Sequence, residues 1–369
     1  MNVIQRKEIG SEFCVGAFPF QAEKDCLEWL HYGNDQILTF SGRTAIETVL
    51  LDILKEGEIK TALLPSWCCS SMLEPFQRLH IRVEFYDVFW EEEHSRLKRQ
   101  INIHRDANIL FLCNYFGYGN HYSKELLKSF KNSGGIIIED ITHSLLQVNP
   151  CHTDSDYYVA SLRKWGPLVS GGICCKKNGT FVSVPRNMPD KEFKIKKTKA
   201  MLLKNRYLHG KEDALKEEYM EIFRKCNEEI SENYSGCRID EISMAMLEEW
   251  DVLWMRGKRR KNSMRLHSGL KNVGGIEFLY SLKEGDCPIF VPIICKTERE
   301  RLRRRLVEER IYCPVHWSKP SEKCRSNLYE LELSLVCDQR YSEEDMQRIC
   351  EVIKDEMGRN GKQGTGHLL

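Results

Sequence analysis

The feature that most constrains the fold is an alternation of short apolar strands with helical patterns between about residues 36 and 180. Strand and helix in succession favour a mostly parallel sheet with helices on both faces. We predict helices at 44–55, 70–79 and 123–131. The predicted strands are a first run ending near residue 40, followed by 62–65, 83–88, 109–114, 135–139, 159–162 and 172–176. The sequence therefore predicts an α/β protein with a mostly parallel seven-stranded sheet.

Polar side chains stand where several of these strands end, which is where such sheets gather their functional groups. Asp140 ends the apolar run IIIED, His143 follows three residues later, and Asn114 ends another run. A buried carboxylate is costly unless it is paired. Asp140 is therefore either a capping or salt-bridged residue or the partner of a cationic ring nitrogen. His143 is either a core histidine or a support for Asp140.

Lys164 lies between an apolar segment and the glycine pair Gly171–Gly172, 24 residues after Asp140. A lysine in isolation is most often a surface residue. An amine held out of water beside a protonated pyridinium is instead a nucleophile that forms an imine. Ser161, three residues before Lys164, is a candidate donor to a phosphate.

The segment Ser41–Gly42–Arg43–Thr44–Ala45 follows an apolar strand and opens a predicted helix. The free N–H groups and the positive dipole end of a helix N-terminus suit a phosphate dianion. A plain N-cap at Ser41 explains the same pattern. Phosphate turn, strand-end carboxylate and lysine, in that order, are the parts that a pyridoxal 5'-phosphate (PLP) enzyme needs.

The remaining chain predicts a second, smaller domain. We expect a large domain at 1–245 with a helical insertion near 188–233, a small α+β domain at 246–358, and a disordered tail at 359–369. The small domain should contain helices at 243–270, 297–309 and 342–356 and strands at 288–295 and 331–335. The insertion is rich in lysine, as in KEFKIKKTKAMLLKN, and forms either a solvated helix face or a rim that attracts an anionic substrate.

Composition excludes several classes. The 55 Lys and Arg residues nearly balance 54 Asp and Glu residues, which disfavours a nucleic-acid binder. No apolar run has the length of a membrane helix, and MNVIQRKEIGSEF has no signal-like apolar stretch, so we expect a cytoplasmic protein. The 16 cysteines are then expected as reduced thiols, with no metal site, because no CxxC pair occurs.

Three segments resemble a known family. SGRTAI, IIIEDITHSLL and SLRKWGPLVSGG are similar to the phosphate-loop, ring-aspartate and lysine motifs of fold-type-I PLP enzymes, the aspartate aminotransferase superfamily. The nearer resemblance is to the DegT/StrS family of sugar aminotransferases. IYCPVHWSKP and LELSLVCDQRYSEEDMQRICEVI resemble the end of its small domain, so that the likeness covers roughly 35–180 and 240–355. The insertion at 188–233 has no clear counterpart.

The resemblance implies roles for particular residues. Lys164 would carry the cofactor as a Schiff base, Asp140 would face the ring nitrogen and His143 the ring oxygen. The other implied cofactor contacts are Gly42, Arg43 and Thr44 in the phosphate turn, Ser161 at the phosphate, Asn114 beside the cofactor, and Trp67 or, equally, Cys69 stacked on the ring. The chain departs from the family where Arg43 replaces a threonine and where Val-Ser precedes the glycine pair.

The function implied by the resemblance is a PLP-dependent aminotransferase that moves an amino group from glutamate to a keto-sugar linked to a nucleotide. A homodimer is expected, with no nucleic-acid or membrane partner. Candidate residues on the substrate side are His316, Trp317, Arg259 and Arg260. Two alternatives stay open: another PLP reaction (decarboxylation, elimination or carbon–carbon bond formation), and a non-catalytic protein that keeps the fold for binding or regulation. A nucleotide-binding α/β protein without PLP lacks support, because no GxGxxG or P-loop motif occurs.

Overall fold

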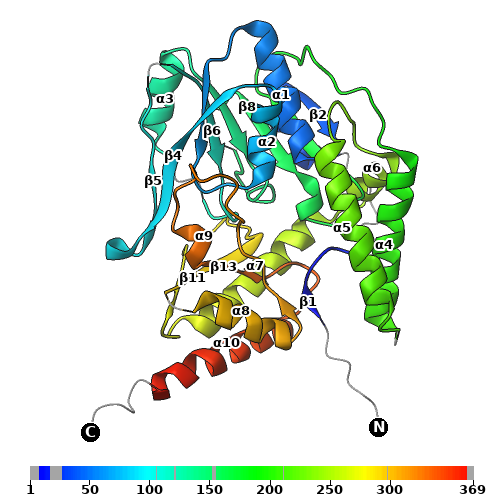
Figure 1. Ribbon diagram of the computed structural model, residues 1–369, viewed down its shortest axis with the longest axis vertical. Helices are drawn as coiled ribbons and strands as arrows, with labels where there is room; N and C mark the ends of the chain where they lie inside the picture. The colour runs from blue at the N-terminus through cyan, green and yellow to red at the C-terminus, as the bar shows by residue number, and fades with distance from the viewer. Residues whose placement is uncertain are drawn as a thin grey trace.

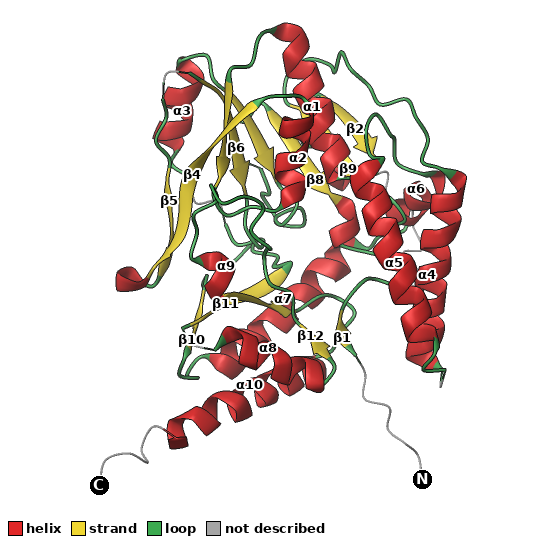
Figure 2. Ribbon diagram, viewed as in Figure 1, coloured by secondary structure: helices red, strands yellow, loops and turns green. Residues whose placement is uncertain are grey.

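A mixed sheet of eight strands forms the centre of the larger domain (Figures 1 and 2). The computed structural model describes residues 8–16, 27–104, 106–119, 122–151, 155–210, 212–296 and 298–363. The strand order is β2-β9-β8-β7-β6-β3-β4-β5. The ladders from β8 through β7, β6 and β3 to β4 are parallel, whereas β2, β9 and β5 pair antiparallel with their neighbours. The strands are β2 (Asp35–Thr39), β3 (Thr61–Pro65), β4 (Arg82–Glu91), β5 (Arg96–Gln100), β6 (Ala107–Cys113), β7 (Ile136–Asp140), β8 (Tyr157–Ser161) and β9 (Gly172–Lys176).

The α/β fold class and the mostly parallel sheet are confirmed, and the sheet has one strand more than we predicted. The additional strand is β5, which pairs with the second half of β4 as a hairpin. Its sequence, RLKRQ, has no apolar run that would reveal a strand. The three predicted helices appear as α1 (Gly42–Glu56), α2 (Ser70–Arg78) and α3 (Lys124–Asn132).

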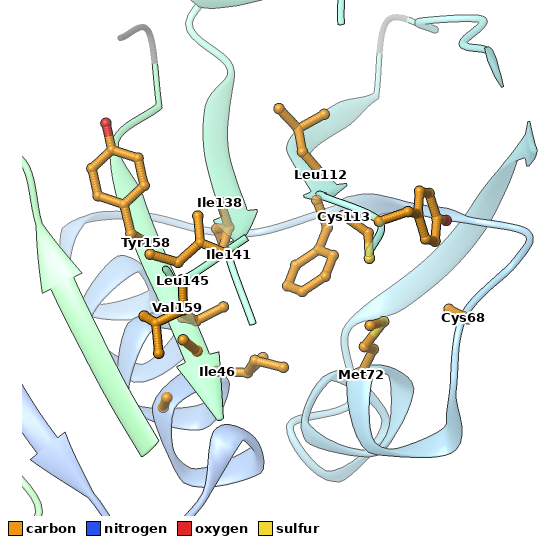
Figure 3. Packing of buried hydrophobic residues seen from close by; sticks show 14 of the residues in the cluster. Ile46, Cys68, Met72, Leu112, Cys113, Ile138, Ile141, Leu145, Tyr158 and Val159 are labelled. Atoms are coloured by element: carbon orange, nitrogen blue, oxygen red, sulfur yellow. The ribbon is translucent and has the colours of Figure 1, made fainter. Parts of the chain in front are cut away.

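The core of the large domain lies between the sheet and the helices that cover it. Figure 3 shows Ile46 of α1 and Met72 of α2 buried near Ile138 of β7 and Val159 of β8, all in one hydrophobic cluster. The carboxyl ends of β7 and β8 therefore lie close to the N-termini of α1 and α2. This arrangement places strand-end polar groups beside the free amides of helix starts.

The predicted helical insertion is an antiparallel pair, α4 (Lys191–His209) and α5 (Leu215–Glu232), that stands at one side of the sheet (Figure 1). The pair has its own buried cluster, which includes Phe193 and Phe223 and is completed by Phe40 and Val169 from the sheet region. The hairpin is thus packed onto the large domain rather than projecting into solvent.

The smaller domain is built on a three-stranded antiparallel sheet, β10-β11-β13. A second, two-stranded sheet pairs β12 in parallel with β1, so the N-terminal strand lies on the small domain. The elements of the smaller domain are β1 (Ile9–Gly10), β10 (Ile276–Phe278), β11 (Phe290–Cys295), β12 (Ile311–Tyr312), β13 (Glu332–Val336), α7 (Val252–Leu270), α8 (Arg299–Glu308), α9 (Leu328–Leu331) and α10 (Glu343–Gln363).

Two predicted boundaries differ from the structure. The single helix expected at 243–270 is two helices, α6 (Glu241–Glu248) and α7, because Asp251 caps α7 by accepting from the Trp254 amide. The tail expected from 359 continues as helix α10 to residue 363, and 364–369 lie outside the described residues.

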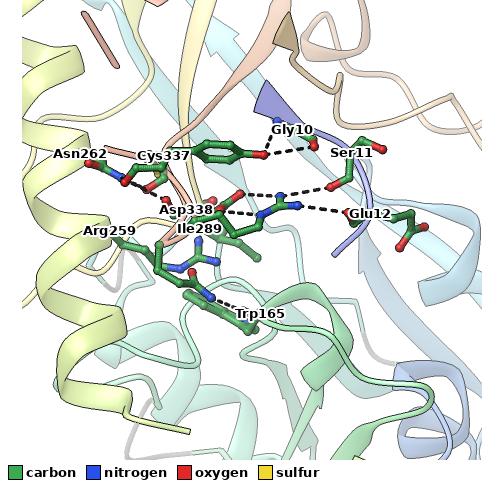
Figure 4. Close-up of polar contacts among 12 residues, drawn as sticks. Gly10, Ser11, Glu12, Trp165, Arg259, Asn262, Ile289, Cys337 and Asp338 are labelled. Carbon is green, nitrogen blue, oxygen red and sulfur yellow. Dashed lines mark hydrogen bonds and ion pairs between the residues drawn. The ribbon is translucent and has the colours of Figure 1, made fainter. Parts of the chain in front are cut away.

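Polar contacts around Arg340 join the small domain to the N-terminal segment (Figure 4). Arg340 holds both carboxylate oxygens of Asp338, at 2.9 and 2.8 Å, and donates to the backbone oxygens of Ser11 and Glu12. Beside it, the Arg259 guanidinium of α7 lies 4.4 Å from the Trp165 ring centroid. The segment just after Lys164 is therefore packed directly against the small domain.

No helix in the described ranges is both long enough and apolar enough to cross a membrane. The cysteines that the structure describes are all free thiols.

Candidate active site

Three chain segments far apart in the sequence meet at one cavity in the large domain. β7 ends at Asp140, β8 ends at Ser161 and leads into the short 3-10 turn that holds Lys164, and α1 begins after Ser41. All of them line this cavity. Its polar lining consists of Ser41, Gly42, Arg43, Cys69, Ser71, Asp140, Thr142, Ser161, Arg163 and Lys164.

Lys164 and His143 are in contact: Lys164 Nζ lies 3.4 Å from His143 Nε2. The Phe116 amide donates to His143 Nδ1 at 3.3 Å, so the proton of the neutral imidazole lies on Nε2. Burial, the charge of Lys164 and the neighbouring His316 together hold the pKa of His143 well below its usual range. Nε2–H can donate to Lys164 only while the lysine nitrogen keeps its lone pair, which is the form that acts as nucleophile or base.

Asp140 is buried and tied to the lysine turn through Thr142. One carboxylate oxygen of Asp140 accepts from the Thr142 amide at 2.8 Å, and the Thr142 hydroxyl oxygen accepts from the Ser161 amide at 3.0 Å. Burial raises the pKa of Asp140, while the bond from Thr142 and the charge of Lys164 oppose the rise. A cationic N–H partner, such as a pyridinium, would stabilise the ionised carboxylate in this place.

The turn at the start of α1 forms a cradle in which Gly172 is required and Gly42 makes a close approach. A Cβ on Gly172 would lie 2.3 Å from the Ser41 carbonyl oxygen, and a Cβ on Gly42 would lie 3.2 Å from the Ser161 Cβ. Ser41 caps the helix by accepting from the Thr44 amide, and the first amides of α1 have no partner within the helix. Free amides, a helix dipole and the side chain of Ser161 fit a phosphate group.

Arg43 lines the same cavity, where its guanidinium is paired with Glu74 of α2. Arg163, the residue before Lys164, also lines it and was not predicted from the sequence. The sequence LRKW does not indicate that both Arg163 and Lys164 line the cavity. Thr142 was likewise missed, although its place two residues after Asp140 is typical of a strand-end turn.

Several residues predicted at the cofactor lie outside the cavity lining. Trp67 is fully buried, stacks on Tyr115 with ring centroids 4.8 Å apart, and donates from its indole to the His316 backbone oxygen. Cys69, the alternative stacking residue, lies in the lining. The Thr44 hydroxyl donates to the Tyr234 carbonyl at 2.9 Å.

Asn114 is used within the strand-end structure. Its amide donates to a Glu139 carboxylate oxygen at 2.7 Å and to the Pro150 carbonyl at 2.9 Å. Asn114 therefore stabilises the loop that follows β7 and lies outside the cavity lining.

A second, larger cavity of about 560 Å³ lies between the two domains and shares Ser161, Arg163 and Lys164 with the first. Of the residues predicted on the substrate side, His316 and Arg259 line this cavity. Trp317 stacks on His143 with centroids 5.8 Å apart. Arg260 instead donates to the backbone oxygen of Lys283. Lys164 thus lies between a small polar cradle and a roomy chamber.

Solved structures share the fold of this protein over nearly the whole chain. The aminotransferase TlmJ from Streptoalloteichus hindustanus superposes with a TM-score of 0.61 at 15% identity, covering 88% of this chain and 86% of that one. DesI, solved in the presence of its TDP-sugar product, gives 0.62 at 12% identity, covering 90% and 83%. The chain has the fold of fold-type-I PLP aminotransferases.

A third match with this aminotransferase fold is the proposed sugar aminotransferase Spr1654 from Streptococcus pneumoniae in its PLP form, with a TM-score of 0.59 at 13% identity and coverage of 88% and 87%. No family model and no curated protein matches the chain. The likeness is therefore one of fold, and the chemistry has to be argued from this chain's own residues.

Proposed function

We propose that the protein is a PLP-dependent aminotransferase that transfers an amino group from glutamate to a keto-sugar linked to a nucleotide. The observation that carries the proposal is the 3.4 Å contact between Lys164 Nζ and His143 Nε2, beside the cavity that Lys164 shares with Asp140 and the Ser41–Gly42 turn. The nucleotide-sugar is supported by the structural match to DesI with its TDP-sugar product.

The residues present fit PLP. The first amides of α1 and the hydroxyl of Ser161 would hold the phosphate, Asp140 would hold the ring nitrogen, and Lys164 would bind the aldehyde carbon. Bound in this way, PLP supplies an electron sink for the substrate carbon that loses its proton.

Each protein group then has one task. With PLP bound, the free Lys164 amine would carry the proton from one carbon to the other in the 1,3-shift. His143 orients that amine through Nε2–H, and the Phe116 amide fixes the histidine tautomer. Trp165 donates from its indole to the Thr142 carbonyl at 2.7 Å and so anchors the turn that carries Lys164.

The first experiment asks whether Lys164 binds the cofactor. Purified protein mixed with PLP should show the visible absorbance of a lysine imine, and borohydride followed by peptide mapping should find the label on Lys164. The Lys164→Ala variant should lose the label. Lys60→Ala is the matched control, because Lys60 is exposed just before β3, and it should label as the parent does. Protein that stays colourless with PLP would contradict the proposal.

The second experiment separates transamination from other PLP reactions. Adding glutamate should abolish the visible absorbance and release 2-oxoglutarate in equal amount. Release of carbon dioxide or ammonia instead would favour decarboxylation or elimination, and no change with any amino acid would favour a binding protein. The proposal includes a homodimer, which sedimentation analysis of the PLP-loaded protein tests.

A further inference from the structure

The interdomain chamber beside Lys164 is unusually rich in cations. Its lining contains six basic residues and only two acids, Glu12 and Asp338. Asp338 is already held on both oxygens by Arg340, at 2.9 and 2.8 Å. Glu12 is therefore left as the acid that faces the remaining basic residues, which are Arg163, Lys164, Lys197, Arg259 and Arg303.

Lys197 of α4 is a buried cation of this lining, and Glu12 is the acid paired with it. Its side chain is only 3% exposed, and its Nζ has no hydrogen-bond partner among the described residues. The nearest acid, Glu12, lies 3.9 Å away, beyond hydrogen-bond distance. The Phe223 ring, with its centroid 4.5 Å from Nζ, gives partial compensation. A buried ammonium in this state gains from any oxyanion brought to it.

Arg163 stands near Lys197 and shares its shortage of partners. Its Nε is buried without a partner among the described residues. Arg163 lines both the cofactor cradle and the chamber. Burial lowers the pKa of Lys197, and the charge of Arg163 lowers it further, while the charge of Glu12 opposes both effects. An anion in this part of the chamber would therefore lie close to the residue next to Lys164.

Glu12 has a fixed backbone and a partly exposed side chain. Its backbone oxygen is fixed by Lys204 of α4 and by Arg340. Its side chain is 43% exposed, and one carboxylate oxygen accepts from the Asn227 amide at 3.2 Å. A rotation of the Glu12 side chain would carry the carboxylate toward solvent with the backbone still in place.

We infer that Lys197, with Arg163, forms an oxyanion subsite that binds a phosphate or carboxylate of the substrate in exchange for the Glu12 carboxylate. This inference rests on the proposed function, since it takes the chamber to receive the substrate of Lys164. The inference gives the α4–α5 hairpin a role in substrate specificity. None of the predicted cofactor motifs lies in this insertion. Lys197 is a binding residue in this scheme and takes no part in proton transfer.

The test is anion binding by calorimetry to PLP-loaded protein and to protein without PLP, with inorganic phosphate, pyrophosphate and glutarate as probes. Lys197→Met should weaken the preferred anion by about ten- to a hundred-fold, the loss of one charge-assisted contact. Glu12→Gln should act in the opposite direction and strengthen binding, because it removes the competing carboxylate. Preference for pyrophosphate identifies the acceptor's phosphate as the bound group, and preference for glutarate identifies the donor's carboxylate.

Lys199→Met is the matched control, since Lys199 lies on the same helix, is 56% exposed and pairs with Glu218 at 2.7 Å. It should bind anions as the parent does, and Lys197→Arg, which keeps the charge, should retain most of the affinity. In turnover, Lys197→Met should raise KM with little change in kcat and with unchanged cofactor absorbance.

Equal effects of the Lys197 and Lys199 variants, or weaker binding in Glu12→Gln, would overturn the subsite, as would failure of all three anions to bind. Anion binding that depends on Lys197 in a protein that takes up no PLP would count against the proposed function alone. PLP uptake with anion binding indifferent to Lys197 would count against the subsite alone.

Discussion

Substitution of Gly172 by alanine tests the cradle directly. The new Cβ would lie 2.3 Å from the Ser41 carbonyl oxygen, 2.4 Å from its carbon and 2.7 Å from the Thr39 hydroxyl. Backbone atoms of the turn must move by about 0.7 Å to reach 3.0 Å, the shortest distance that real Cβ atoms keep. Overpacking against a rigid partner costs about 3 kcal/mol at the upper end of its range. Urea unfolding should show that loss in the free energy of unfolding.

The same displacement moves the amides that would hold the phosphate in the proposed function. Loss of one hydrogen bond to a charged group weakens binding by about ten- to a hundred-fold. Titration of the visible absorbance should therefore show a raised Kd for PLP in Gly172→Ala. Gly274→Ala is the control, because nothing lies within 4 Å of its added Cβ and its stability should change by less than about 1 kcal/mol. A Gly172→Ala protein that is destabilised yet binds PLP as tightly as the parent would refute the assignment of this turn to the phosphate.

Three further outcomes are expected. The Asp140→Asn variant should still bind PLP on Lys164. With glutamate, its visible absorbance should decay about a hundred-fold more slowly in stopped flow, because the ring nitrogen loses its anionic partner. An unchanged rate would remove Asp140 from the mechanism. Since burial and the nearby Lys164 lower the pKa of His143, the folded protein binds fewer protons there than the unfolded chain, and stability should fall as pH drops below about 6.5, by about 1.4 kcal/mol per pH unit. His143→Gln should lose that part of the slope in urea unfolding at several pH values; the same slope in both proteins would contradict it. The Asp52 carboxylate accepts from Tyr157 at 2.9 Å and from Lys176 at 2.7 Å. Asp52→Asn should therefore lower the free energy of unfolding by about 3 kcal/mol and leave the affinity for PLP unchanged. A change in that affinity would mean that this network reaches the cradle.

The meeting of Asp140, Ser161 and Lys164 at one cavity could be predicted because local rules place these residues. Asp140 ends β7, and the lysine turn follows β8, the parallel neighbour of β7. Parallel neighbours bring their carboxyl ends to one edge, so order in the sequence becomes proximity in space. The contact between His143 and Lys164 follows from the same geometry, since each lies three residues beyond its strand end.

The choice between Trp67 and Cys69 needed information that the sequence does not carry. Trp67 and Cys69 are two residues apart after β3, and either could face the cavity according to how the turn folds. The turn is decided by tertiary contacts: the Cys68 amide donates to the Tyr329 hydroxyl at 3.0 Å, and Trp67 donates to the His316 backbone. Both partners belong to the small domain, more than 240 residues away. The Trp67 side chain therefore packs where the two domains join, and the smaller Cys69 lies in the cavity lining.

The chamber on the other side of Lys164 has a lining that is harder to predict from the sequence than the lining of the first cavity. Glu12, Lys197 and Arg259 come from the N-terminal segment, the α4–α5 hairpin and α7, and no periodic pattern relates them. They meet because β1 pairs with β12 and because Arg340 and Lys204 fix the backbone of residue 12. Each of these contacts depends on the two domains already being in place. The first cavity is thus formed by one sheet and its strand ends, whereas the lining of the chamber is formed by the packing of the domains, the hairpin and the N-terminal segment against one another.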